Sequence, residues 1–182
     1  MLGTRLFILG ALADRGPMHG HKIRGAAQQD RVELWTDIKP GSLYGALRRM
    51  ADEGLVEVVR TEQEGNLPAR TVYGITDEGR AQLVGEIRAV LADTKLRPEP
   101  MYLVLQHGNL LDDGEMREAV RSRREAFQSQ LDFWRGLYEE AAPWLTGLEP
   151  LAFDHTILRL EAEISWHDRL LAALPPTEGG ST

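Results

Sequence analysis

The segment at residues 39–50, KPGSLYGALRRM, constrains the fold of this chain more than any other. Leu43, Leu47 and Met50 recur at the spacing that places side chains on one face of an α-helix. A proline stands in the first turn, where helices tolerate it. The segment therefore predicts a helix over residues 40–53 whose apolar stripe packs against the rest of a domain.

The other face of this predicted helix is rich in groups that suit contact with phosphate. It carries the hydroxyls of Ser42 and Tyr44, the guanidinium groups of Arg48 and Arg49, and a bare Gly45. Such a surface can lie close to a nucleic-acid backbone. An amphipathic helix whose arginines are merely solvated is the alternative interpretation.

Composition places the chain among ordinary globular proteins. Its 182 residues suffice for one large domain or two small ones, with 42% hydrophobic and 27% charged residues. The absence of cysteine excludes disulfides and thiolate metal sites, and it fits a cytoplasmic protein. No apolar run approaches the roughly 20 residues that span a bilayer, so we expect no membrane partner.

The net charge of −7 is unfavourable for nucleic-acid binding by the chain as a whole. Residues 1–80, however, hold 11 basic and 11 acidic side chains, whereas residues 81–182 hold 10 and 17. The deficit thus belongs to the C-terminal part. DNA binding remains compatible with this balance if the N-terminal cations are clustered.

The residues before and after the predicted helix at 40–53 indicate a small domain. Glycine and proline at positions 16 and 17 end one helix, and Gly54 suits the left-handed position after another. The expected elements are helices at 4–14, 20–29 and 40–53 and strands at 55–59 and 70–75, with a turn-rich tip at 62–68. Three helices and a hairpin are typical of a winged helix-turn-helix, whose third helix enters the major groove of DNA.

The rest of the chain is predicted to be helical. Thr76 caps a helix in which Leu83, Ile87 and Leu91 form a stripe that we expect to face inward. The fold class is therefore mainly α with a small β-hairpin. We predict a winged-helix domain at 1–94, a linker at 95–100, a helical dimerisation or effector domain at 101–176 and a disordered tail at 177–182.

Two long amphipathic helices dominate the predicted second domain. Their apolar positions are Met116, Val120, Phe127, Leu131, Trp134 and Tyr138 in the first and Phe153, Ile157, Leu160, Ile164, His167, Leu171 and Leu174 in the second. Little chain is left to cover these faces, so the pattern predicts a homodimer formed through these helices. A monomeric bundle is the alternative.

Several segments together resemble the PadR family of bacterial transcriptional regulators. They are ILG at 8–10, GPMHGH at 16–21, PGSLY at 40–44, EGLV at 53–56 and YGITDEGR at 73–80. The resemblance covers roughly the first 80 residues. The helix layout and the QHGNLL segment at 106–111 resemble the longer of the family's two kinds of C-terminal domain.

This resemblance implies a homodimeric repressor that a small molecule or another signal releases from operator DNA. The residues expected to contact DNA are His19, Lys22, Lys39, Ser42, Tyr44, Arg48, Arg49 and Arg70. Lys39 stands where the family often has a capping serine or threonine, although a lysine there can still reach phosphate. Glu62 and Glu64 give the wing tip an acidic character that disfavours contact with the backbone along its whole length.

Other chemistry is weakly indicated. Phe127, Trp134 and Trp166 are candidates for an effector pocket, although aromatics at helical spacing also form cores and interfaces. His19 and His21 are expected to point in different directions on a helix, and the histidines show no metal-ligand spacing. The sequence has no cofactor-binding or catalytic motif, so we expect no enzyme. A protein-interaction module and a ligand-sequestering protein are the alternative functions.

Overall fold

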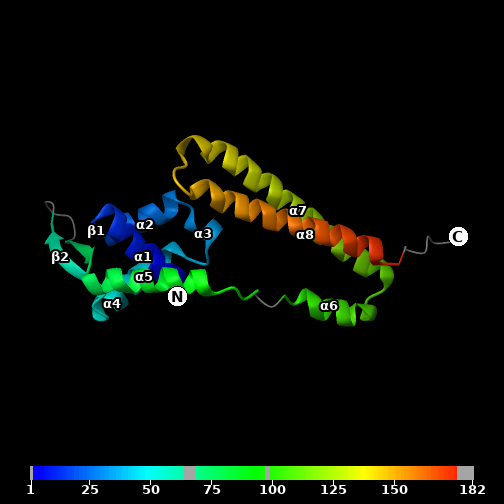
Figure 1. Ribbon diagram of the computed structural model, residues 1–182, viewed down its shortest axis with the longest axis horizontal. Helices are drawn as coiled ribbons and strands as arrows, with labels where there is room; N and C mark the ends of the chain where they lie inside the picture. Colours follow the sequence, from blue (N-terminus) through cyan, green and yellow to red (C-terminus); the bar gives the residue numbers. More distant parts are fainter. Residues whose placement is uncertain (1, 64–68, 97–98, 176–182) are drawn as a thin grey trace. The chain divides into compact units, whose positions relative to one another are not determined.

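The computed structural model describes residues 2–63, 69–96 and 99–175, and its contacts divide the chain into two compact units, 1–96 and 97–182 (Figure 1). The expected tail at 177–182 lies outside the described residues. No helix in the described part is long and apolar enough to cross a membrane. The elements of the first unit are α1 (Leu2–Arg15), β1 (Met18–His19), α2 (Gly20–Gln29), α3 (Val32–Trp35), the 3-10 helix η1 (Pro40–Ser42), α4 (Leu43–Asp52), β2 (Val56–Glu62), β3 (Arg70–Ile75) and α5 (Asp77–Ala92).

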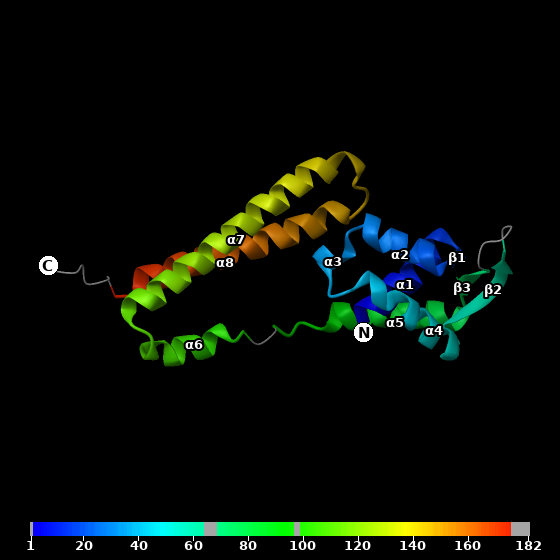
Figure 2. The same ribbon diagram turned by 180° about the vertical axis from the view of Figure 1, so that it is seen from behind.

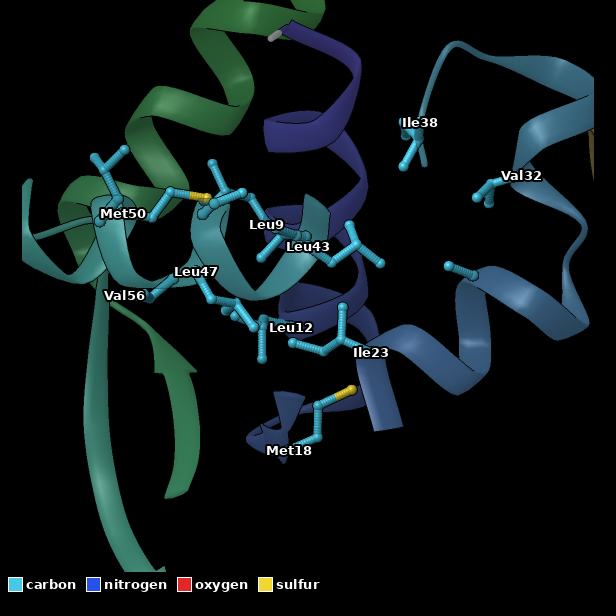
Figure 3. Close-up of a cluster of buried hydrophobic side chains, with 14 residues drawn as sticks. Leu9, Leu12, Met18, Ile23, Val32, Ile38, Leu43, Leu47, Met50 and Val56 are labelled. Carbon is cyan, nitrogen blue, oxygen red and sulfur yellow. The ribbon is translucent and has the colours of Figure 1, made fainter. Parts of the chain in front are cut away.

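The predicted fold class is confirmed: the first unit is a winged helix. Its hydrophobic core gathers side chains from α1, α2, α4 and β2 (Figure 3). Leu9, Leu43 and Leu47 are at most 1% exposed, so the apolar stripe of α4 packs as the sequence predicts. The positive φ of Gly54, 74°, ends this helix in the left-handed conformation expected of it.

The wing contains one strand more than predicted. β1 pairs antiparallel with β3, through Met18 opposite Tyr73, and β3 in turn pairs with β2. The order of the strands is β1-β3-β2. A strand of two residues is too short to show an alternating pattern in the sequence. The sequence also does not predict α3, because a single turn is too short to show a helical period.

Helix α5 begins at a tight junction with the end of α4. Thr76 Oγ1 accepts a hydrogen bond from the Gly79 amide at 3.0 Å and donates one to the Gly54 carbonyl at 2.7 Å. The expectation that the stripe of α5 faces inward is wrong for its second half. Ile87 is 44% and Leu91 is 77% exposed, because nothing in the described part of the unit covers them.

The second unit is a helical hairpin with a short helix before it. Its elements are α6 (Met101–His107), η2 (Gly108–Leu110), α7 (Asp113–Ala141), η3 (Ala142–Trp144) and α8 (Glu149–Ala173). Figure 2 shows α7 and α8 side by side along most of their length. A capping box starts α7, since Asp112 accepts from the Glu115 amide at 2.8 Å while Glu115 accepts in return from the Asp112 amide.

Much of the apolar stripe of the two long helices is buried within this hairpin. The buried side chains are Met116, Val120, Leu131 and Trp134 from α7 and Phe153, Leu160, Ile164 and His167 from α8. The stripe that suggested self-association is therefore largely satisfied inside one chain. Dimerisation stays a prediction, and it depends on the side chains that remain exposed.

Candidate nucleic-acid interface

Helix α4 presents the face that the sequence predicts. Arg48 and Arg49 are exposed, as is Gly45, on the side opposite the buried Leu43 and Leu47. The apolar side anchors the helix in the core, so the guanidinium side faces solvent.

Tyr44 is partly exposed and also packs against a neighbouring helix. Its side chain is 41% exposed, yet its ring packs closely on the start of α2. A Cβ atom added to Gly20 would lie 3.0 Å from Tyr44 Cε1 and 3.3 Å from a methyl group of Leu47. Glycine at position 20 thus permits the close approach of α2 and α4.

A cleft of about 520 Å³ opens between α4, the start of α2 and strand β3. It is lined by His19, Gly20 and His21, by Tyr44, Leu47 and Arg48, and by Ala69, Arg70, Thr71 and Tyr73. Four of the residues predicted to contact DNA, separated by up to 51 positions in the chain, therefore meet here: His19, Tyr44, Arg48 and Arg70.

The cleft and its rim are electropositive. Lys22, Arg48 and Arg70 form no ion pair with any residue of the described ranges. Partial burial lowers the pKa of His21 below its ordinary value. The charges of Arg70, His19 and Lys22 lower this pKa further, as expected where cations are crowded.

The histidine pair behaves differently from the expectation for a helix. The rings of His19 and His21 stack with their centroids 5.2 Å apart. They meet because His19 is extended, at φ −72° and ψ 149°, and stands before the first turn of α2. His21 was not among the predicted contacts. The signal in the sequence was that His21 lies only two positions from His19. The prediction of different directions assumed that both residues belong to one helix.

The wing carboxylate of Glu62 is held by basic side chains. Its Oε2 lies 2.9 Å from Nε2 of His19, and Nε of Arg60 donates to its other oxygen. This hydrogen bond from Arg60 is the main reason that the pKa of Glu62 lies below its ordinary value. The carboxylate of Glu62 therefore occupies groups of both His19 and Arg60 that could otherwise bind another anion.

The start of the helix offers two further candidates. Lys39 has an extended backbone and gives no side-chain cap, as the sequence suggests. The hydroxyl of Ser42 donates to the Lys39 carbonyl at 2.8 Å, so its oxygen lone pairs remain available as acceptors. Both side chains are exposed.

Arg49 lies apart from the cleft. It lines a smaller cavity of about 220 Å³ with Arg5 and Glu53, and it forms no ion pair within the described ranges. Arg5 bonds to Glu53 and lies 3.9 Å from Glu86 Oε1. This arginine of α1 thus connects the end of α4 with α5 and leaves Arg49 free.

The three candidate effector residues are separated in the second unit. Trp166 lines a cavity of about 280 Å³. Phe127 instead packs against His167, with 5.1 Å between ring centroids, and Trp134 is 8% exposed and packs against Phe153. Among the described residues, no group of three or more histidine, aspartate or glutamate side chains is placed to hold a metal ion.

The fold and this site define a winged-helix protein with a basic cleft beside the helix that corresponds to the recognition helix. Residues 8–84 match the family described as the transcriptional regulator PadR-like family. The resemblance seen in the sequence is thereby confirmed. No curated protein matches the chain.

Several solved structures share the fold. Bacillus subtilis PadR in complex with operator DNA is 22% identical with a TM-score of 0.69, over 94% of this chain and 97% of that chain. The same protein in complex with p-coumaric acid is 21% identical with a TM-score of 0.70, over 92% and 96%. The Vibrio cholerae virulence activator AphA is 18% identical with a TM-score of 0.67, over 93% and 96%. The chain is thus similar to the PadR-like family in its N-terminal sequence and to these structures in its fold.

Proposed function

We propose that this protein is a DNA-binding transcriptional regulator that acts as a homodimeric repressor. The observation that carries the proposal is the convergence of Tyr44, Arg48 and Arg70 in one electropositive cleft beside an exposed recognition helix. Helix α4 would enter the major groove, while Lys22, Lys39, Ser42 and Arg49 flank it. His19 would reach the backbone after exchanging Glu62 for phosphate.

A second copy would supply the rest of the operator contact. Two copies of α4 read a pseudo-palindromic site whose half-sites are about 10 bp apart or a small multiple of that. Apolar side chains that remain exposed on α5 and α6 support such an interface, among them Leu91 at 77% and Leu103 at 60%. The repressor would act in the cytoplasm, where the operator lies.

A small-molecule effector would release the repressor. The support is the cavity beside Trp166 in the second unit, together with the structure of Bacillus subtilis PadR in complex with p-coumaric acid. The three candidate residues do not share one cavity, so the proposal places the effector beside Trp166 rather than Trp134.

Electrophoretic mobility shifts on the DNA upstream of the protein's own gene test the proposal. We expect binding that survives excess random competitor DNA. Arg48→Gln should lower the slope of log K against log salt by about 0.9, because one phosphate contact is lost. Arg88→Gln, which removes an equal charge from the exposed face of α5, is the matched control and should leave the slope unchanged.

Two alternative functions give other results. A protein-interaction module would bind the upstream DNA no more tightly than random duplex. A ligand-sequestering protein would bind a small molecule with an affinity that DNA does not change, whereas effector binding to a repressor and DNA binding must oppose each other by the same factor.

A further inference from the structure

The cavity of the second unit has an unusual balance of charge for a site that would accept an organic acid. Its volume of about 280 Å³ suits a ligand with a single ring. The lining residues that determine its chemistry are Glu99, Tyr102, Arg123, Ala162, Glu163 and Trp166. Two aromatic rings and two carboxylates thus surround one arginine.

That arginine is already engaged by the protein. Nε of Arg123 donates to Nε2 of His167 at 3.1 Å, and Nη2 lies 3.5 Å from the Glu99 carboxylate. Its guanidinium also lies over the ring of Phe127, 5.2 Å from the centroid. A ligand anion would have to compete with all three partners.

The buried histidine cannot replace the arginine as an anion receptor. His167 is fully buried, and its Nε2 must accept from Arg123. Its proton therefore resides on Nδ1, which lies 2.7 Å from the backbone carbonyl of Glu163 and donates to it. Both nitrogens of the imidazole are occupied in this arrangement.

Glu163 carries the second negative charge of the cavity lining. Its carboxylate oxygen lies 3.8 Å from Nδ1 of His167, and it forms no ion pair with a lysine or arginine of the described residues. With Glu99 offset by Arg123, the lining keeps one uncompensated negative charge beside the aromatic surface of Trp166. Such a combination attracts a cation and repels a carboxylate.

We propose that this cavity binds an aromatic amine in its protonated form, with the ring against Trp166 and Tyr102 and the ammonium group at Glu163. The inference rests on the proposed function, since it names the chemical class of the effector. It distinguishes this protein from Bacillus subtilis PadR, whose structure was determined with p-coumaric acid.

Tyramine and p-coumaric acid are suitable probes, because both carry a 4-hydroxyphenyl ring and their side arms have opposite charges at pH 7. Isothermal titration of the full-length protein in the absence of DNA should show tyramine binding at least about tenfold more tightly. Glu163→Gln should weaken tyramine binding by roughly fivefold or more and reduce the preference between the two probes. Glu139→Gln, an equal loss of charge on an exposed position of α7, should change neither.

A second variant locates the site by shape instead of charge. Ala162→Trp should fill the cavity and abolish tyramine binding, with the helical content and melting temperature measured by circular dichroism as a check on folding. Any of four results would overturn the inference. They are equal affinity for the two probes, preference for p-coumaric acid, no binding of either probe, and unchanged affinity of the Glu163→Gln variant for tyramine. These measurements contain no DNA, so their failure is separate from a failure to bind the operator.

Discussion

Glu62 changes the charge of the surface around His19 and Arg60. In the sequence it counts against contact between the wing and DNA. In the fold its carboxylate lies between His19 and Arg60 and neutralises part of the charge that would otherwise face a phosphate. Ion pairs of an exposed carboxylate contribute little to stability because water and salt screen them, so a duplex can displace this one.

Removing this carboxylate should therefore strengthen binding to any duplex. We expect Glu62→Gln to steepen the salt dependence of binding to random DNA by up to about 0.9, because one basic side chain becomes available to phosphate. Glu57→Gln, an exposed position of the same strand, is the control for the change in net charge. Equal effects of the two substitutions would show that the contacts of Glu62 with His19 and Arg60 are irrelevant to binding.

His21 should make DNA binding depend on pH. Its pKa lies below the ordinary value of 6.5, first through burial and then through Arg70 and other cations. DNA phosphates would neutralise these cations and raise the pKa, so the complex takes up a proton and affinity increases as the pH falls below about 6.5. Titration of binding by fluorescence anisotropy between pH 7.5 and 5.5 measures this effect.

The same shift has the opposite consequence for the free protein. Below about pH 6.5 the unfolded chain binds more protons at His21 than the native state, so the contribution of this group to stability declines as the pH falls. His21→Gln should reduce the pH dependence of DNA binding, whereas His155→Gln in α8 should preserve it. An unchanged pH profile in His21→Gln would contradict the assignment.

At the scale of elements, the junction between α4 and α5 fixes the recognition helix. Thr76 bonds to the Gly54 carbonyl just after α4 and to the Gly79 amide in the first turn of α5. A Cβ atom at Gly79 would lie 2.0 Å from the Leu55 carbonyl oxygen. The backbones meet here so closely that no side chain fits between them.

Gly79→Ala should therefore destabilise the first unit by about 3 kcal/mol or more, since the clash is with backbone and cannot be relieved by a rotamer change. Gly85→Ala in the same helix meets nothing within 4 Å. This control should stabilise the protein by about 0.5–1 kcal/mol, because alanine favours the helix. Urea unfolding of both variants measures the difference, and equal stabilities would mean that the junction yields easily.

At the scale of the whole molecule, the exposed apolar side chains need an explanation. The residues of α6 after Met101 are exposed, including Leu103 at 60%, and the second half of α5 exposes Leu91 at 77%. Exposed apolar side chains that are close together on one helix often mark an interface. A second copy of the chain would cover them in the proposed dimer.

Leu103→Glu should shift the protein from dimer to monomer at micromolar concentration, because the interface would bury an unpaired charge. Sedimentation velocity measures this change. Val58→Glu, at an equally exposed position of the wing, is the control and should leave the mass unchanged. A monomeric wild-type protein at these concentrations would refute both the proposed dimer and the proposed mode of operator binding.

Much of the fold was predictable, because local patterns encode it. The stripe of Leu43, Leu47 and Met50 placed α4 and its exposed arginines correctly. The hydroxyl and acids around Thr76 likewise marked the start of α5. Elements as short as β1 and α3 were missed because they contain too few residues to display a period.

The sequence by itself determined which side of each helix is apolar and which carries the chemistry, since periodicity is a property of neighbouring residues. Only the tertiary structure decided what covers each side. It buried Met116 and Leu131 within a hairpin, left Leu91 open, and brought Glu62 to His19 across the wing. These outcomes depend on contacts between segments far apart in the chain, which no local pattern specifies.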